Sequence, residues 1–130
     1  MVEVELRRIT INDTGDRQYI VLGEKGGDRM LPIVIGYAEA QAINRFIKGE
    51  QMPRPMTHDL ALSLIHATDA VMDRIEVTDL KEGTFYAVVH PTRPDGTRVE
   101  VDARPSDAIA LACAEEKPIF MAESVLKEGV

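Results

Sequence analysis

The chain has 130 residues, of which 45% are hydrophobic and 28% are charged, and these proportions are typical of a globular domain and argue against a disordered chain. The formal net charge of −7 argues against binding of nucleic acid through a broad basic surface, but it is compatible with a local basic or metal-bridged site. The single cysteine, Cys113, excludes an intrachain disulfide and a multi-cysteine metal site, and its apolar neighbours indicate a small buried side chain.

The N-terminus and the hydropathy pattern bear on cellular location. The first residues alternate between charged and apolar types and do not resemble a secretion signal. No apolar run approaches the roughly 18 residues that a membrane-spanning helix needs. We therefore expect a single domain over residues 1–130, located in the cytoplasm and without a membrane partner.

The spacing of hydrophobic residues predicts a series of short strands and helices. In chain order, we expect strands at 2–11, 18–23 and 30–35, helices at 38–48 and 58–68, strands at 71–78, 84–90 and 98–102, a helix at 107–115, a strand at 119–121 and a last helical turn at 124–127. The alternation in the first strand changes phase at Arg7 and Arg8. Pro32 favours an edge position or a bulge for the third strand, and Gly49 lies where a helix C-cap belongs.

This order of elements indicates the fold class. Strands and helices do not alternate regularly, so a doubly wound parallel sheet is not expected. The pattern favours an α+β domain with a mostly antiparallel twisted sheet and about three helices packed against one side of it.

Two similar segments precede predicted helices. An Arg-Pro pair begins at Arg54 ahead of Thr57, and another begins at Arg104 ahead of Ser106, with each hydroxyl residue expected to cap its helix. A helix N-terminus offers unpaired N–H groups and a partial positive charge, and a guanidinium matches phosphate oxygens in pairs. We therefore predict that Arg54, Arg104 and Ser106 bind phosphate. In the alternative interpretation, each proline only rigidifies the start of a helix and each arginine pairs with a nearby carboxylate.

Titratable side chains lie beside both segments. His58 can exchange a proton near neutral pH, and Asp59 and Asp107 are its candidate catalytic partners. In the alternative interpretation, both aspartates only interact favourably with the helix dipole, and His58 is an exposed surface residue.

Three carboxylates are candidate metal ligands. Glu39, Asp102 and Asp107 could supply the oxygen ligands that Mg²⁺ or Mn²⁺ prefers, and such an ion would let an acidic protein hold a phosphate. In the alternative interpretation, Ser106 and Asp107 only form a favourable helix start.

Four segments together carry a family resemblance. They are residues 31–36 (Leu-Pro-Ile-Val-Ile-Gly), residues 39–40 (Glu-Ala), residues 54–59 (Arg-Pro-Met-Thr-His-Asp) and above all residues 102–112 (Asp-Ala-Arg-Pro-Ser-Asp-Ala-Ile-Ala-Leu-Ala). They resemble the bifunctional nuclease domain along nearly the whole chain, from about Val4 to Leu126, although Met56 stands where leucine is expected. The resemblance implies action on both DNA and RNA with little sequence preference. It assigns no catalytic roles, so the roles given above rest on chemistry alone.

Two functions remain open from the sequence. The first is a nuclease that hydrolyses phosphodiester bonds, with nucleic acid as its partner and a divalent metal as a candidate cofactor. The second is a non-catalytic anion-binding or assembly module, which the acidic charge and the few aromatic residues favour. A strand-rich N-terminal region with Pro32 at an expected sheet edge also predicts a homodimer.

Overall fold

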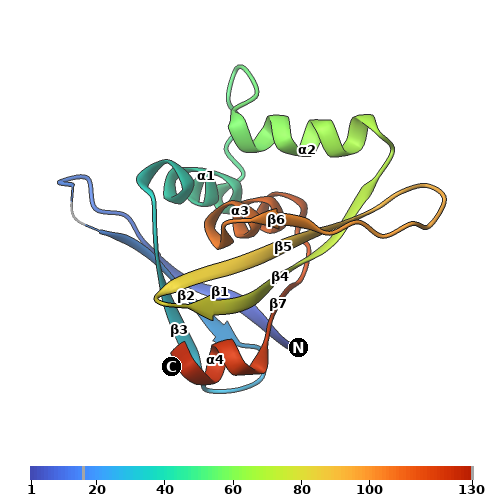
Figure 1. The fold of residues 1–130 in the computed structure, drawn as a ribbon. Helices are drawn as coiled ribbons and strands as arrows, with labels where there is room; N and C mark the ends of the chain where they lie inside the picture. Colours follow the sequence, from blue (N-terminus) through green and yellow to red (C-terminus); the bar gives the residue numbers. More distant parts are fainter. Residues whose placement is uncertain (16, 130) are drawn as a thin grey trace.

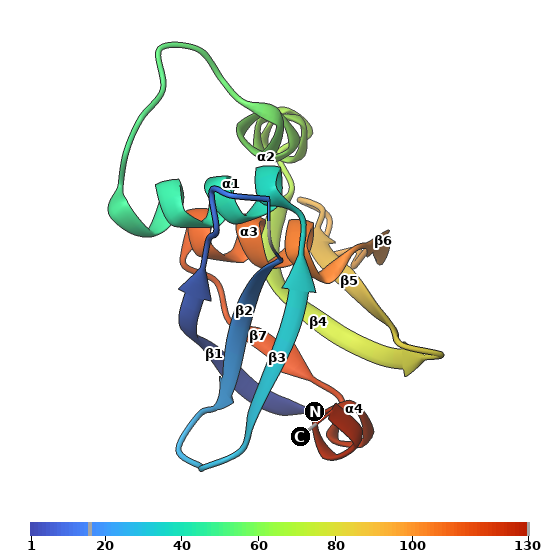
Figure 2. The same cartoon turned by 90° about the vertical axis from the view of Figure 1, so that its left-hand side faces the viewer.

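A computed structural model describes residues 1–15 and 17–129 of the chain. Along these residues the elements are β1 (Val2–Thr10), β2 (Gln18–Glu24), β3 (Met30–Ile35), α1 (Tyr37–Lys48), α2 (Thr57–Ala67), β4 (Val71–Lys81), β5 (Thr84–Thr92), β6 (Val101–Ala103), α3 (Pro105–Glu115), β7 (Ile119–Met121) and α4 (Glu123–Gly129). The helices α1, α2 and α3 gather at one end of the sheet and α4 lies at the opposite end (Figures 1 and 2). No helix among these residues is long and apolar enough to cross a bilayer.

All seven strands of the described residues form one sheet in the order β3-β2-β1-β7-β4-β5-β6. Neighbouring strands are antiparallel except for β4 and β7, which run parallel. The mostly antiparallel sheet predicted from the sequence is therefore confirmed.

Several local expectations are also confirmed. The register between β1 and β2 shifts between Leu6 and Arg8, where the alternation changes phase. The strand β3 lies at an edge of the sheet, a position where Pro32 costs no ladder hydrogen bond on its open side. Gly49 adopts the left-handed conformation, with φ of 71°, that ends α1.

The helices differ from the expectation in number and placement. Four helices, not three, occur in the described residues, because the turn predicted at 124–127 is a seven-residue helix, α4. Its residues Val125 and Leu126 are buried in the core, which accounts for the extra helical turn. The helix α4 lies at the other end of the sheet from α1, α2 and α3 (Figure 1), and its buried residues belong to the same core as theirs.

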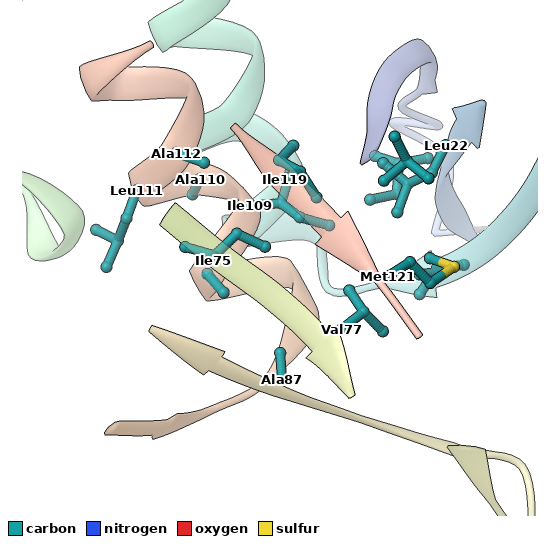
Figure 3. Packing of buried hydrophobic residues seen from close by; sticks show 14 of the residues in the cluster. Leu22, Ile75, Val77, Ala87, Ile109, Ala110, Leu111, Ala112, Ile119 and Met121 are labelled. Atoms are coloured by element: carbon teal, nitrogen blue, oxygen red, sulfur yellow. The ribbon is translucent and has the colours of Figure 1, made fainter. Parts of the chain in front are cut away.

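The core lies between the sheet and α3, which positions the candidate site. Ile75 of β4, Met121 of β7 and Ile109 of α3 are fully buried together (Figure 3). The alanines at 108, 110 and 112 are buried as well, and their small side chains let α3 pack closely on its neighbours. The first turn of α3 is thereby held firmly at the border of the core.

Candidate functional site

The start of α3 brings Arg104 to the surface. Pro105 is the first helical residue, where its missing N–H costs nothing, and Arg104 is the N-cap with extended backbone, φ −72° and ψ 145°. The prediction that Ser106 caps this helix is therefore wrong. Ser106 is the second helical residue and is buried, with 6% of its surface exposed. The Arg104 side chain is 66% exposed, so it can reach a ligand.

Side chains from three helices meet around Arg104 and Asp107 at the start of α3. Its Oδ1 lies 2.8 Å from Nε2 of His58 on α2, and its Oδ2 accepts a hydrogen bond from Nε of Arg104 at 2.9 Å. Nη2 of Arg104 lies 3.3 Å from Oε2 of Glu39 on α1. The four side chains form one connected network from α1, α2 and α3.

The network keeps Asp107 ionised. Partial burial opposes ionisation of this carboxyl, but the hydrogen bonds from Arg104 and His58 outweigh burial and lower its pKa below the ordinary value. The same contact with Asp107 raises the pKa of the Arg104 guanidinium. Because an ionised carboxylate can only accept, Nε2 of His58 carries the proton of the shared hydrogen bond. In neutral His58, Nδ1 is then the atom that can take up a proton.

The start of α2 differs from the expectation in a similar way. The N-cap is Met56, not Thr57, which is the first helical residue, so the predicted Thr57 cap is wrong. Asp59 occupies the third helical position and accepts a hydrogen bond from the Met56 backbone N–H at 2.9 Å. Its Oδ2 also binds Nη2 of Arg45 on α1 at 2.9 Å. Asp59 thus fixes the start of α2 and holds Arg45.

A cleft of about 510 Å³ lies between α1, α2 and α3, and we call it the helix cleft. Its polar lining comes from Glu39, Gln41, Arg45, Glu50, Thr57, His58, Arg104 and Asp107. Its apolar lining comes from Ala38, Ala42, Met52, Met56, Ala61 and Leu111. The volume lies within the range of about 300–1,000 Å³ that is usual for small-molecule sites. The network around Asp107 therefore borders a space large enough for a ligand.

A second cavity of about 290 Å³ lies on the other side of Arg104, and we call it the hairpin cavity. It is lined by Ile33, Val34, Ile35, Gly36, Gly83, Thr84, Phe85, Arg104, Pro105 and Ser106. These residues belong to the end of β3, the turn between β4 and β5, and the start of α3. Ser106 therefore faces the hairpin cavity, whereas His58 and Asp107 face the helix cleft.

Two predicted site residues lie away from this network. Arg54 is exposed in the loop before α2 and lines neither the helix cleft nor the hairpin cavity. Asp102 of β6 pairs with Val88, while the next residue, Ala103, pairs with the buried Ala87 and packs against the core. Because successive side chains of a strand point to opposite faces, Asp102 lies on the face of the sheet away from the helices.

The predicted metal ligands do not form a ligand set. Glu39 and Asp107 both contact Arg104, whose guanidinium supplies the positive charge between them, and Asp102 faces away. Across residues 1–15 and 17–129, no group of three or more His, Cys, Asp or Glu side chains gathers as a metal site. In this arrangement Arg104 supplies the positive charge beside Glu39 and Asp107, and metal binding by these residues stays a prediction.

The sequence analysis missed Arg45. Its side chain is 12% exposed, lines the helix cleft, and lies with Cζ 4.3 Å from the centre of the Phe46 ring. In the sequence it is one of two basic residues in the last turn of α1, a place where basic residues commonly interact with the helix dipole. Its contact with Asp59 depends on how α1 and α2 pack, so no local signal identifies it.

Known proteins similar to this chain identify its family. The bifunctional nuclease domain matches residues 20–130. The chain belongs to this family. An uncharacterized protein of Mycobacterium tuberculosis, present in two strains, is 40% identical over 129 residues, which cover 99% of this chain and 76% of the relative. Bifunctional nuclease 1 of rice, Oryza sativa, is 22% identical over 116 residues, which cover 87% of this chain and 35% of the rice protein. The resemblance read from the four motifs is confirmed.

Proposed function

We propose that this protein is a cytoplasmic nuclease that hydrolyses phosphodiester bonds of DNA and RNA with little sequence specificity. The observation that carries the proposal is the contact of His58 with Asp107 beside the exposed guanidinium of Arg104, at the border of the helix cleft. Family membership and the names of the rice relatives support the same activity.

Each side chain of the network has a distinct role in the proposed reaction. Arg104 binds the scissile phosphate through N–H groups that Asp107 and Glu39 leave free, and it neutralises charge that develops on the phosphoryl oxygens. Asp107 orients His58 and stabilises its protonated form, as a carboxylate beside a catalytic histidine does. Asp59 acts as a positioning residue, because it holds Arg45 against the helix cleft.

The proposed reaction is a displacement at phosphorus by water. Nδ1 of His58 takes a proton from the water, whose oxygen forms the new bond to phosphorus. The bond between phosphorus and the departing sugar oxygen breaks, and that oxygen takes a proton from bulk water. None of these steps uses a metal ion. Metal assistance through Glu39, Asp102 and Asp107, and phosphate binding by Arg54 and Ser106, remain predictions from the sequence.

The deciding experiment compares the wild type with Asp107→Asn and with Asp69→Asn. Asp69 has a positive φ of 60° at the end of α2, a conformation that asparagine also tolerates, so Asp69→Asn is a matched control. All three proteins are purified by the same route and incubated with single-stranded RNA, single-stranded DNA and duplex DNA, in Mg²⁺, in Mn²⁺ and in EDTA. Cleavage by the wild type and Asp69→Asn, but not by folded Asp107→Asn, supports the proposal. Equal cleavage by all three overturns it, because a contaminating host nuclease gives that result.

The alternative function is a non-catalytic anion-binding or assembly module. One observation favours it: Glu39 and Asp107 both contact Arg104, so the site has little surplus positive charge. A protein of this kind binds inorganic phosphate or an oligonucleotide but cleaves no substrate under any of the metal conditions above.

The predicted homodimer is also part of the proposal. The strand β3 is an edge strand whose residue Met30 is 47% exposed and lines neither cavity, and edge strands can pair with a second copy. Met30→Lys is expected to convert a dimer to a monomer in size-exclusion chromatography with light scattering. If the wild type is already a monomer at high concentration, the dimer proposal is wrong.

A further inference from the structure

The guanidinium of Arg104 is shared by two cavities. The helix cleft lies on its α1 and α2 side, and the hairpin cavity lies on its β3 and β5 side. Both cavities include Arg104 in their walls, and they have no other residue in common. Because the Arg104 side chain is 66% exposed, a phosphate bound to it has a recess on either side.

We infer that these two recesses are subsites for the two nucleotides that flank one phosphate, so that the substrate is an unpaired strand. This inference rests on the proposed function and specifies its substrate class. The phosphate binds at Arg104, one base enters the helix cleft, and the neighbouring nucleotide lies along the hairpin cavity.

The lining of the helix cleft suits the face of a base. Ala42 and Ala61 leave room between α1 and α2, and Met52 and Met56 offer flexible, polarisable side chains that adapt to flat rings. Gln41 lies among these apolar residues and supplies polar groups for the edge of a base. Contacts made to the face of a base do not depend on which base it is, which agrees with low sequence specificity.

A paired base cannot make these contacts without leaving its duplex. The helix cleft is a recess lined by residues of three helices and of the loop between α1 and α2, and α2 stands above α1 and α3 at this end of the molecule (Figures 1 and 2). A base must therefore leave its stack to enter, which costs least when it is already unpaired. A duplex also brings a second phosphate backbone toward a protein of net charge −7.

The test uses cavity-filling variants, each with a control that places the same side chain at an exposed position outside both cavities. Ala61→Phe fills the helix cleft, and Ala67→Phe places the same ring on an exposed position of α2 that lines neither cavity. Thr84→Trp fills the hairpin cavity, and Thr97→Trp places the same side chain in an exposed loop. Met52→Glu changes the wall of the helix cleft from an exposed loop position, so it serves as a second variant if Ala61→Phe does not fold.

The measured quantity is the dissociation constant, by fluorescence anisotropy, of a labelled twelve-nucleotide thymidine strand and of the same strand in a duplex, in EDTA and in Ca²⁺. We expect the single strand to bind about tenfold more tightly than the duplex. Ala61→Phe, Met52→Glu and Thr84→Trp are each expected to weaken single-strand binding about tenfold, while Ala67→Phe and Thr97→Trp leave it unchanged. Equal affinity for strand and duplex, absence of binding to both, or filled variants that bind like the wild type would each overturn the inference.

A cleavage assay on the same two probes separates this inference from the proposed function. Preferential single-strand binding without cleavage retains the two subsites and refutes the nuclease. Cleavage of strand and duplex at equal rates, unaffected by Ala61→Phe, retains the nuclease and refutes the two subsites.

Discussion

The starts of α2 and α3 have similar sequences, but their side chains make different contacts. An Arg-Pro pair lies before the N-cap of α2 and across the N-cap and first residue of α3, and each helix carries an aspartate at its third position, Asp59 in α2 and Asp107 in α3. In α2 the aspartate caps the helix through the Met56 N–H and binds Arg45. In α3 the aspartate contacts His58 and Arg104 instead. The difference shows that the neighbouring helices, and not the local motif, decide whether such an aspartate stabilises a helix or joins a site.

The largest expected effect is on the rate of phosphodiester cleavage, which should depend on Asp107 and not on Asp59. Asp107→Asn removes the negative charge that stabilises protonated His58 and puts an amide NH₂ donor in place of one carboxylate oxygen, and His58→Ala removes the proposed base, so each is expected to lower phosphodiester cleavage by about a hundredfold or more. Initial rates on a labelled RNA strand measure the loss, and circular dichroism confirms folding. If Asp59→Asn lowers the rate equally, Asp59 belongs to the catalytic set that the sequence predicted.

Arg104 and Arg54, one near the start of each helix, allow the same comparison for oligonucleotide binding. Arg104→Ala is expected to weaken oligonucleotide binding about tenfold or more, because a hydrogen bond to a charged group contributes about 1.5–3 kcal/mol. Arg54→Ala is expected to change the affinity less than twofold, since Arg54 is exposed and lines neither cavity. Anisotropy titrations at a single salt concentration measure both constants. Equal losses would mean that both Arg-Pro segments bind phosphate, as the sequence predicts.

A smaller effect is expected on stability, and here Asp59, which binds a backbone N–H, is the aspartate whose substitution is tested. Asp59→Asn weakens the cap of α2 and the contact with Arg45, so it is expected to lower the free energy of unfolding by about 1 kcal/mol. Urea denaturation at neutral pH measures this loss, and Asp69→Asn again serves as the control. A folded Asp59→Asn protein with unchanged stability would show that the Met56 cap does not contribute.

The smallest expected effect is on the pH dependence of stability. The pKa of Asp107 is lower in the folded protein than in the unfolded chain, so the unfolded chain takes up the proton first as the pH falls. The stabilising contribution of Asp107 is therefore complete above its unfolded pKa of about 3.9 and is lost as the pH falls through the lower folded value. Urea denaturation from about pH 6 to about pH 3 should show the wild type losing its advantage over Asp107→Asn. A difference that stays constant over this range would contradict the prediction.

Local features of the fold were predictable because they are encoded in adjacent residues. The phase change at Arg7 and Arg8 predicted the irregular register of β1, Pro32 predicted an edge strand, and Gly49 predicted the end of α1. The cap of α3 was mispredicted for a local reason too. Ser106, a hydroxyl residue after proline, satisfies the pattern of an N-cap, but Pro105 itself is well suited to the first helical position and occupies it.

The site could be predicted only as a set of candidate residues. His58 and Asp107 were both selected for their chemistry, but their contact depends on the packing of α2 against α3. Arg45 was missed because its partner Asp59 lies on another helix. Asp102 was grouped with Asp107 because of their closeness in sequence, although the register of β5 and β6 directs Asp102 to the opposite face of the sheet.

The short strand β7 has a consequence for the order of folding. The meander β1-β2-β3 and the hairpin β4-β5 with β6 are each built from neighbouring segments. In the sheet that the described residues form, they are joined through β7, which pairs with β1 on one side and β4 on the other. Pairing of Val4 with Ile119 closes almost the whole chain into a loop, and such distant contacts form slowly. The two halves of the sheet can therefore gain structure early in synthesis, but they become one sheet only when the residues near the end of the chain have left the ribosome. Glu39 and Asp107 follow different halves of the sheet, so the network that joins them through Arg104 is complete only after the two halves have come together.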